Sequence, residues 1–104
     1  MVFGKWISKD TGNTARRLVN ELHATFPAEF CTAGTGRAAA LRRKGVEHLL
    51  KSVDALRREN RPGMLGRLFF ARAFQRELSA FGYPAEFSRQ VVAAALVELT
   101  RPTT

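Results

Sequence analysis

Cysteine is almost absent from this sequence: Cys31 is the one thiol among 104 residues. A single thiol excludes an internal disulfide, and it also excludes a zinc site built from paired cysteines. We therefore expect Cys31 to serve as a small apolar side chain that is buried or half-buried. The lack of disulfides fits a reducing compartment, so the predicted location is cytoplasmic.

Long apolar runs are also missing. The longest covers residues 91–97, whereas a membrane-spanning helix needs about 20 apolar residues. The first residues lack the apolar stretch of a signal peptide, and we expect no integral membrane insertion. The segment 1–9 contains Phe3, Trp6 and Ile7, too few apolar residues to classify. We expect it either to be mobile or to pack through Trp6 over an open end of the domain.

Acidic residues are scarce beside basic ones: 17 Lys and Arg face 9 Asp and Glu, which gives a net charge of +8. Such a charge favours anionic partners, including nucleic acid, an acidic protein surface or another polyanion. The alternative is that the basic charge is compositional, because GC-rich coding raises arginine and alanine together. The sequence leaves both interpretations open.

Residues arranged for catalysis are not found. Cys31 and the two histidines, His23 and His48, have no spacing typical of a nucleophile–base pair or a metal site. The Gly34-Thr35-Gly36-Arg37 loop lacks the remainder of a phosphate-binding loop, so a connection with a threonine cap is favoured. We therefore expect no enzyme, no metal site and no cofactor.

What the sequence does contain is helical periodicity. Apolar residues recur every three to four positions in the stretches 13–26, 37–59, 64–81 and 85–100, and no alternating strand pattern of useful length appears. Gly45 interrupts the second stretch, which indicates a close helix crossing or a kink. Gly82 and Pro84 are placed to end the third helix and begin the fourth. We predict one all-α domain over residues 1–104, folded as a four-helix bundle.

The two halves of the chain echo each other. Residues 15–22 (ARRLVNEL) resemble residues 71–78 (ARAFQREL), and the tetrapeptide Pro-Ala-Glu-Phe occurs at 27–30 and again at 84–87. Ala-Ala-Ala-Leu follows at 38–41 and at 93–96. This repetition predicts two helical hairpins of one design, related by a pseudo-two-fold axis.

The fourth stretch is apolar around nearly its whole circumference. Such a helix lies either at the centre of a bundle or in the seam of a dimer. The residues predicted for a dimer interface are Val91, Val92, Leu96 and Leu99.

Arginine clusters carry the remaining functional signal. If they converge in space, they form an electrostatic footprint for phosphates. The residues predicted to contact nucleic acid or another anion are Arg42, Arg43, Arg57, Arg58, Arg72 and Arg76. Cations at 57 and 58 also complement the negative end of a helix dipole, which is a purely structural use.

One segment has a family resemblance. The residues 69–76 (FFARAFQR) followed by Phe81-Gly82-Tyr83 resemble a helical repeat of the RecX-type recombinase regulators. That family is basic, is built from tandem helical repeats and acts on a nucleoprotein filament. The resemblance does not include the family's other motifs, so no functional residue is transferred from it.

The sequence therefore predicts a non-catalytic helical interaction protein, with a homodimer as one form and another protein as the alternative partner. The second hypothesis is a basic nucleic-acid-binding module that contacts phosphates through arginine-rich helix faces.

Overall fold

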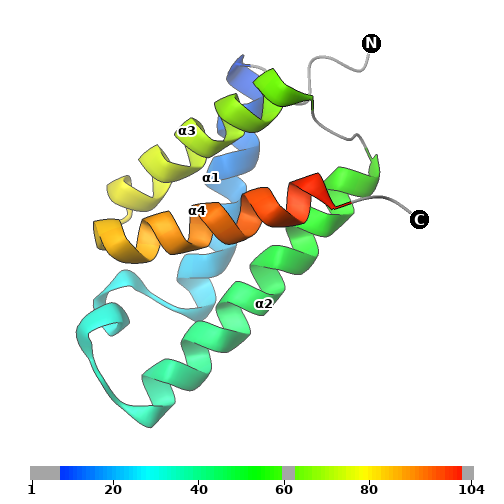
Figure 1. Ribbon diagram of the computed structural model, residues 1–104. Coiled ribbons are helices and arrows are strands. Elements are labelled where there is room, and N and C mark those ends of the chain that lie inside the picture. The colour runs from blue at the N-terminus through cyan, green and yellow to red at the C-terminus, as the bar shows by residue number, and fades with distance from the viewer. Residues whose placement is uncertain (1–7, 60–62, 102–104) are drawn as a thin grey trace.

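Helices account for all regular structure in the described residues. The computed structural model describes residues 8–59 and 63–101. The elements are α1 (Ser8–Thr25), the short 3₁₀ helix η2 (Ala28–Thr32), α2 (Gly36–Glu59), α3 (Met64–Ala80) and α4 (Ala85–Thr100) (Figure 1). The all-α fold with four main helices is therefore confirmed. The ends of α2, α3 and α4 lie within one residue of the predicted ends.

The start of α1 differs from the prediction. The helix begins at Ser8, whereas the sequence indicated Asn13. Thr11 lies inside the helix with a buried side chain. Packing against the domain offsets the weak helix propensity of such residues. Of the N-terminal segment 1–9, Ser8 and Lys9 belong to α1, and residues 1–7, including Trp6, lie outside the described residues.

The two Pro-Ala-Glu-Phe copies begin in the same way and then diverge. Pro27 has φ −59° and ψ 149°, and Pro84 has φ −60° and ψ 150°, so each proline leads the chain into a helical turn. After Pro27 the turn is the short η2, and Gly34 follows with φ +65°. After Pro84 the turn continues directly into α4, whose apolar run begins at Val91. We call the α1–α2 connection at Pro27 and the α3–α4 connection at Pro84 the two corners. The echo is therefore real at both corners, but only the second corner continues directly into a long helix.

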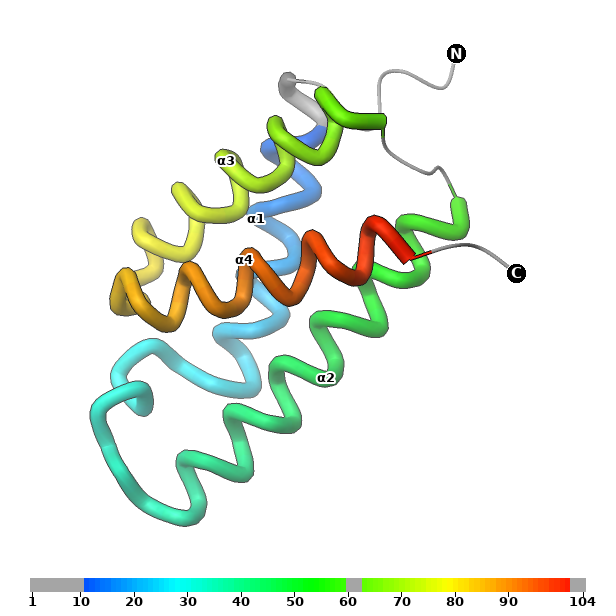
Figure 2. The backbone as a smooth tube through the Cα atoms, in the orientation of Figure 1, coloured from blue at the N-terminus to red at the C-terminus, as the bar shows by residue number. Residues whose placement is uncertain are grey.

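Corresponding helices of the two hairpins lie side by side. Figure 2 shows α1 and α3 starting at the same end of the molecule, and an ion pair between Arg16 and Glu77 links them. Hydrogen bonds of 2.8 Å join α2 to the α4 side at both ends, from Arg42 to Gln90 and from Arg57 to the carbonyl oxygen of Arg101. Both pairs are therefore parallel. The main contacts run α1–α2, α2–α4, α4–α3 and α3–α1, which orders the helices in a ring.

Gly45 marks a close approach of α1 and α2. A Cβ atom at this position would lie 3.1 Å from Cδ1 of Leu22 and 3.3 Å from Cβ of Phe26. The predicted close crossing is confirmed, and it explains why a helix interior tolerates glycine at this point.

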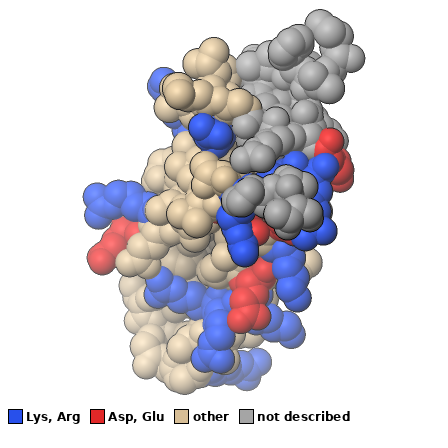
Figure 3. All heavy atoms as spheres, turned by 45° about the vertical axis from the view of Figure 1, so that its right-hand side comes forward, with Lys and Arg blue, Asp and Glu red and all other residues tan. Residues whose placement is uncertain are grey.

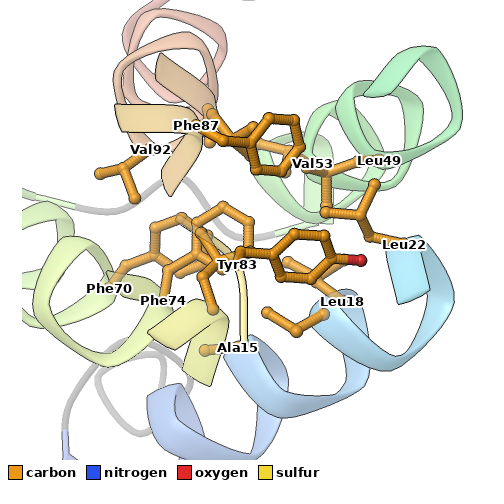
Figure 4. Close-up of a cluster of buried hydrophobic side chains, with 14 of the residues drawn as sticks. Ala15, Leu18, Leu22, Leu49, Val53, Phe70, Phe74, Tyr83, Phe87 and Val92 are labelled. Atoms are coloured by element: carbon orange, nitrogen blue, oxygen red, sulfur yellow. The ribbon is translucent and has the colours of Figure 1, made fainter. Parts of the chain in front are cut away.

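The core draws aromatic and aliphatic side chains from every main helix (Figure 4). Phe70 and Phe74 come from α3, and their ring centroids lie 5.2 Å apart. The other fully buried large apolar side chains are Phe26, Leu18, Leu22, Leu49, Leu78, Leu99, Val19 and Val53. Burial of this kind is the main stabilising contribution in a domain of this size.

Candidate binding surfaces

Large apolar side chains are exposed along the first half of α3. Gly66, Phe70, Phe74 and Leu78 form the buried side of this helix. The opposite side carries residues whose exposed fractions are 79% for Met64, 66% for Leu65, 54% for Leu68 and 38% for Phe69. We call these four residues the α3 apolar surface. Adjacent exposed apolar side chains, unlike single scattered ones, mark interaction sites.

A groove between α1 and α3 lies next to this surface. It encloses about 510 Å³ and is lined by Gly12, Asn13, Arg16, Phe69, Arg72, Ala73, Arg76 and Glu77. Its carboxylate, Glu77, lies 3.5 Å from Nε of Arg16. No ion pair of Arg72 or Arg76 occurs among residues 8–59 and 63–101. The α1–α3 groove therefore presents two uncompensated guanidinium groups beside an aromatic ring.

A second groove lies between α2 and α4. It encloses about 310 Å³ and is lined by Ala39, Arg42, Arg43, Val46, Phe87, Gln90, Val91 and Ala94. Nη2 of Arg42 donates a hydrogen bond to Oε1 of Gln90 at 2.8 Å, and its guanidinium carbon lies 4.9 Å from the ring centroid of Phe87. The α2–α4 groove is thus mostly apolar, with a positioned cation at one edge.

Cys31 lies near Arg42 but does not line the α2–α4 groove. It helps to line a neighbouring cavity of about 360 Å³ together with Glu86 and Gln90. The side chain is half-buried and packs against the core, as expected of a small apolar residue. Burial raises the pKa of the thiol, and the charge of Arg42 opposes that rise only in part. A raised pKa keeps the sulfur in the less nucleophilic thiol form.

Thr35 confirms the threonine cap predicted for the Gly34–Arg37 loop. Its Oγ1 accepts a hydrogen bond from the main-chain N–H of Ala38 at 3.0 Å, which caps the start of α2.

The six arginines predicted to bind anions fall into separate places. Arg42 and Arg43 lie at the α2–α4 groove, whereas Arg72 and Arg76 lie at the α1–α3 groove. Arg58 is exposed, and its Nε lies 3.0 Å from Oδ2 of Asp54. Figure 3 shows Lys and Arg outnumbering Asp and Glu on the visible face. The charge is therefore spread over more than one helix face.

Arg57 differs from the other five because it is buried, with 6% of its surface exposed. Its guanidinium contacts the Asp54 carboxylate and donates to the carbonyl oxygen of Arg101 at 2.8 Å. The side chain thus joins the end of α2 to the residue after α4. This is the structural use of a cation at a helix end, and it does not present Arg57 to an external phosphate.

The residues predicted for a dimer seam lie largely inside the single chain. Val91, Val92 and Leu99 are buried, and Leu96 is half-buried against the core. On α4 the exposed large apolar residue is Val97, with 64% of its surface exposed. The apolar circumference of α4 is therefore used mainly for packing against α2 and α3.

Sequence reasoning missed two features of these surfaces. The exposure of Leu65 and Leu68 was not predicted, although the helical period places both opposite the stripe of Phe70, Phe74 and Leu78. The contact of Arg42 with Gln90 joins residues 48 positions apart, so local spacing does not reveal it.

Comparisons with family models, with curated proteins and with solved structures find no match for this chain. None of the described helices is long and apolar enough to cross a membrane. In the same part of the chain, no group of three or more His, Cys, Asp or Glu side chains is placed to hold a metal ion.

Proposed function

We propose that this chain is a non-catalytic interaction protein that binds another protein through the α3 apolar surface. The observation that carries the proposal is the exposure of Met64, Leu65 and Leu68 on one side of a single helix. Leaving large apolar side chains in water forgoes about 25 cal/mol for each Å² that a partner would cover. A partner that covers these residues gains that free energy.

Charge indicates the kind of partner. Arg72 and Arg76 follow the α3 apolar surface along the same helix, and their guanidinium groups line the adjoining groove without an ion pair in the described chain. A partner with acidic residues beside an apolar patch matches this arrangement. A second copy of the chain is the other candidate, but two copies bring together net charges of +8 each, which favours the acidic partner.

A double substitution and a matched control test the proposal. We compare L65S/L68S with the control V97S, which removes an exposed apolar side chain from α4. Light scattering over a range of concentrations measures self-association, and quantitative affinity purification from the source cells measures capture of other proteins. We expect one partner to be retained by the wild type and V97S and lost by L65S/L68S, with equal helicity in all three. The proposal would be contradicted if the wild type is monomeric and if no captured protein is lost in L65S/L68S while being kept in V97S.

A second candidate function is the binding of nucleic acid through phosphates. It is supported by the α1–α3 groove, where Arg72 and Arg76 stand beside the ring of Phe69. Guanidinium groups bind phosphates, and an aromatic ring offers a surface on which bases stack. Arg16 shares this groove but is paired with Glu77.

Fluorescence anisotropy with a labelled oligothymidylate tests this candidate. We expect binding at low salt that weakens as salt rises, because each neutralised phosphate releases counterions. R72Q/R76Q is expected to weaken binding by about tenfold or more, whereas K51Q/R89Q changes it by less than about twofold. Lys51 and Arg89 are exposed cations that line neither groove, so they match the charge change. Equal losses in both variants, or no binding at low salt, would exclude the groove as the site.

A further inference from the structure

Arg42 is positioned by two neighbours on α4. The hydrogen bond to Gln90 fixes one edge of the guanidinium, and the ring of Phe87 supports its face. Phe87 is itself held, because it stacks on Tyr83 with ring centroids 5.1 Å apart. A cation held in place by its own protein loses less conformational entropy when a ligand binds. Arg42 is therefore better prepared for an anion than a free surface arginine.

The α2–α4 groove beside Arg42 is apolar. Its walls include the side chains of Ala39, Val46, Val91 and Ala94, and its charged lining residues are Arg42 and Arg43. No carboxylate is among the residues that line it, and within the described chain no ion pair of Arg42 occurs. Pockets for small ligands are typically a few hundred Å³, largely apolar, with a few polar groups that fix orientation. The groove meets each of these conditions.

We propose that the α2–α4 groove binds a small carboxylate with an apolar tail, and that Arg42 receives the carboxylate head. A planar guanidinium pairs with a carboxylate through two parallel hydrogen bonds, and Gln90 leaves N–H groups of Arg42 available for them. The tail lies along the alanine and valine side chains, where each buried methylene strengthens binding by about fourfold. This site is separate from the α3 apolar surface, and its test does not depend on a protein partner.

Three related probes test which part of the ligand is recognised. Hexanoate carries both the charge and the tail, hexanamide keeps the tail without the charge, and acetate keeps the charge without most of the tail. Nuclear magnetic resonance titrations at pH 7 follow the amide signals of Ala39, Val46 and Ala94. We expect saturable shifts with hexanoate and at least about tenfold weaker binding of hexanamide and of acetate. Equal effects of hexanoate and hexanamide would overturn the proposal, because recognition of the carboxylate is its central claim.

Matched variants locate the site on the protein. R42Q removes the guanidinium, and we expect hexanoate to bind at least about tenfold more weakly. The control R89Q removes an exposed arginine of α4 that does not line the groove, and it should leave the affinity unchanged. A39W fills the groove, whereas A40W places the same side chain at an exposed neighbour outside it. The proposal is supported if R42Q and A39W lose binding while R89Q and A40W keep it. Unaltered binding of hexanoate in either R42Q or A39W would overturn the proposal.

Discussion

The hydroxyl of Tyr83 donates a hydrogen bond to the main-chain carbonyl of Phe26, with 2.5 Å between the oxygen atoms. Each of these residues directly precedes the proline at a corner, Phe26 before Pro27 and Tyr83 before Pro84. Their rings are stacked at 24° with centroids 6.5 Å apart. The corners of the two echoing hairpins are therefore joined to each other, in addition to being built alike.

Removing this hydroxyl should lower stability. In Y83F the buried carbonyl of Phe26 loses its donor, and we expect the free energy of unfolding to fall by about 1–2 kcal/mol. Urea denaturation followed by circular dichroism measures the change. V97A, at a side chain with 64% of its surface exposed, is the control and should change stability by less than about 0.5 kcal/mol. An unchanged unfolding midpoint in Y83F would show that the corner bond contributes nothing.

The burial of Tyr83 also predicts that the domain loses stability at alkaline pH. Burial, with a smaller contribution from Cys31, raises the pKa of Tyr83 well above its usual value of 10.0. The unfolded chain releases the phenolic proton near pH 10 while the folded chain retains it, so stability is full below about pH 10 and declines above it. Because Tyr83 is the one tyrosine, ultraviolet absorbance reports it directly. We expect the tyrosinate signal to appear with unfolding, and a signal near pH 10 in folded protein would contradict this.

For Asp54 we expect the opposite pH dependence, in which stability falls in acid. The hydrogen bond from Arg57, aided by the charges of Arg58 and Arg101, lowers the pKa of this carboxyl despite partial desolvation. The stabilisation is present above the unfolded pKa of about 3.9 and is lost as the pH falls through the lower folded value. D54N should therefore be less stable than the wild type at pH 7, and the difference should vanish in strong acid. Thermal denaturation at a series of pH values checks this, and a difference that persists in acid would argue against the ion pairs as its source.

Gly45 should not accept a large side chain. G45L forces a side chain between α1 and α2, where a Cβ alone already meets Leu22 at 3.1 Å, and we expect a loss of about 1–3 kcal/mol. Gly12 is the matched control because it lies inside α1, and a Cβ added to it would meet nothing within 4 Å. G12L should be neutral or stabilising, since leucine favours helix more than glycine does. Comparing the unfolding midpoints in urea measures both changes, and equal effects would mean that helix propensity, and not the close approach, decides the outcome.

Gly82 is required for its backbone conformation. Its φ is +93°, and its N–H and that of Tyr83 donate to the carbonyl oxygens of Ser79 and Leu78, which closes α3. G82A should cost about 1–2 kcal/mol because a Cβ is strained at positive φ. G36A, at a glycine with negative φ and open space, is the control. Calorimetric melting temperatures compare the two, and an equally stable G82A would contradict the strain argument.

The sequence predicted the features that depend on local chemistry. Gly82 and Pro84 define the end of α3 and the start of α4 because each residue restricts its own backbone. The predicted start of α1 was wrong because tertiary packing, seen in the burial of Thr11, extends the helix beyond the stretch in which apolar residues recur. The contacts of Arg42 with Gln90 and of Arg57 with the carbonyl oxygen of Arg101 were not predicted, because each joins residues more than 40 positions apart. Periodicity shows that a helix has an apolar side, but it does not show which neighbour covers that side.

The ring order of the helices has a consequence for assembly. Because α1 is covered by α3 as well as by α2, neither hairpin by itself encloses its apolar side chains. The peptide that joins Glu59 to Gly63 supplies proximity, while side-chain packing supplies the specificity with which the halves recognise each other. The two hairpins on either side of that connection therefore present complementary apolar surfaces to each other.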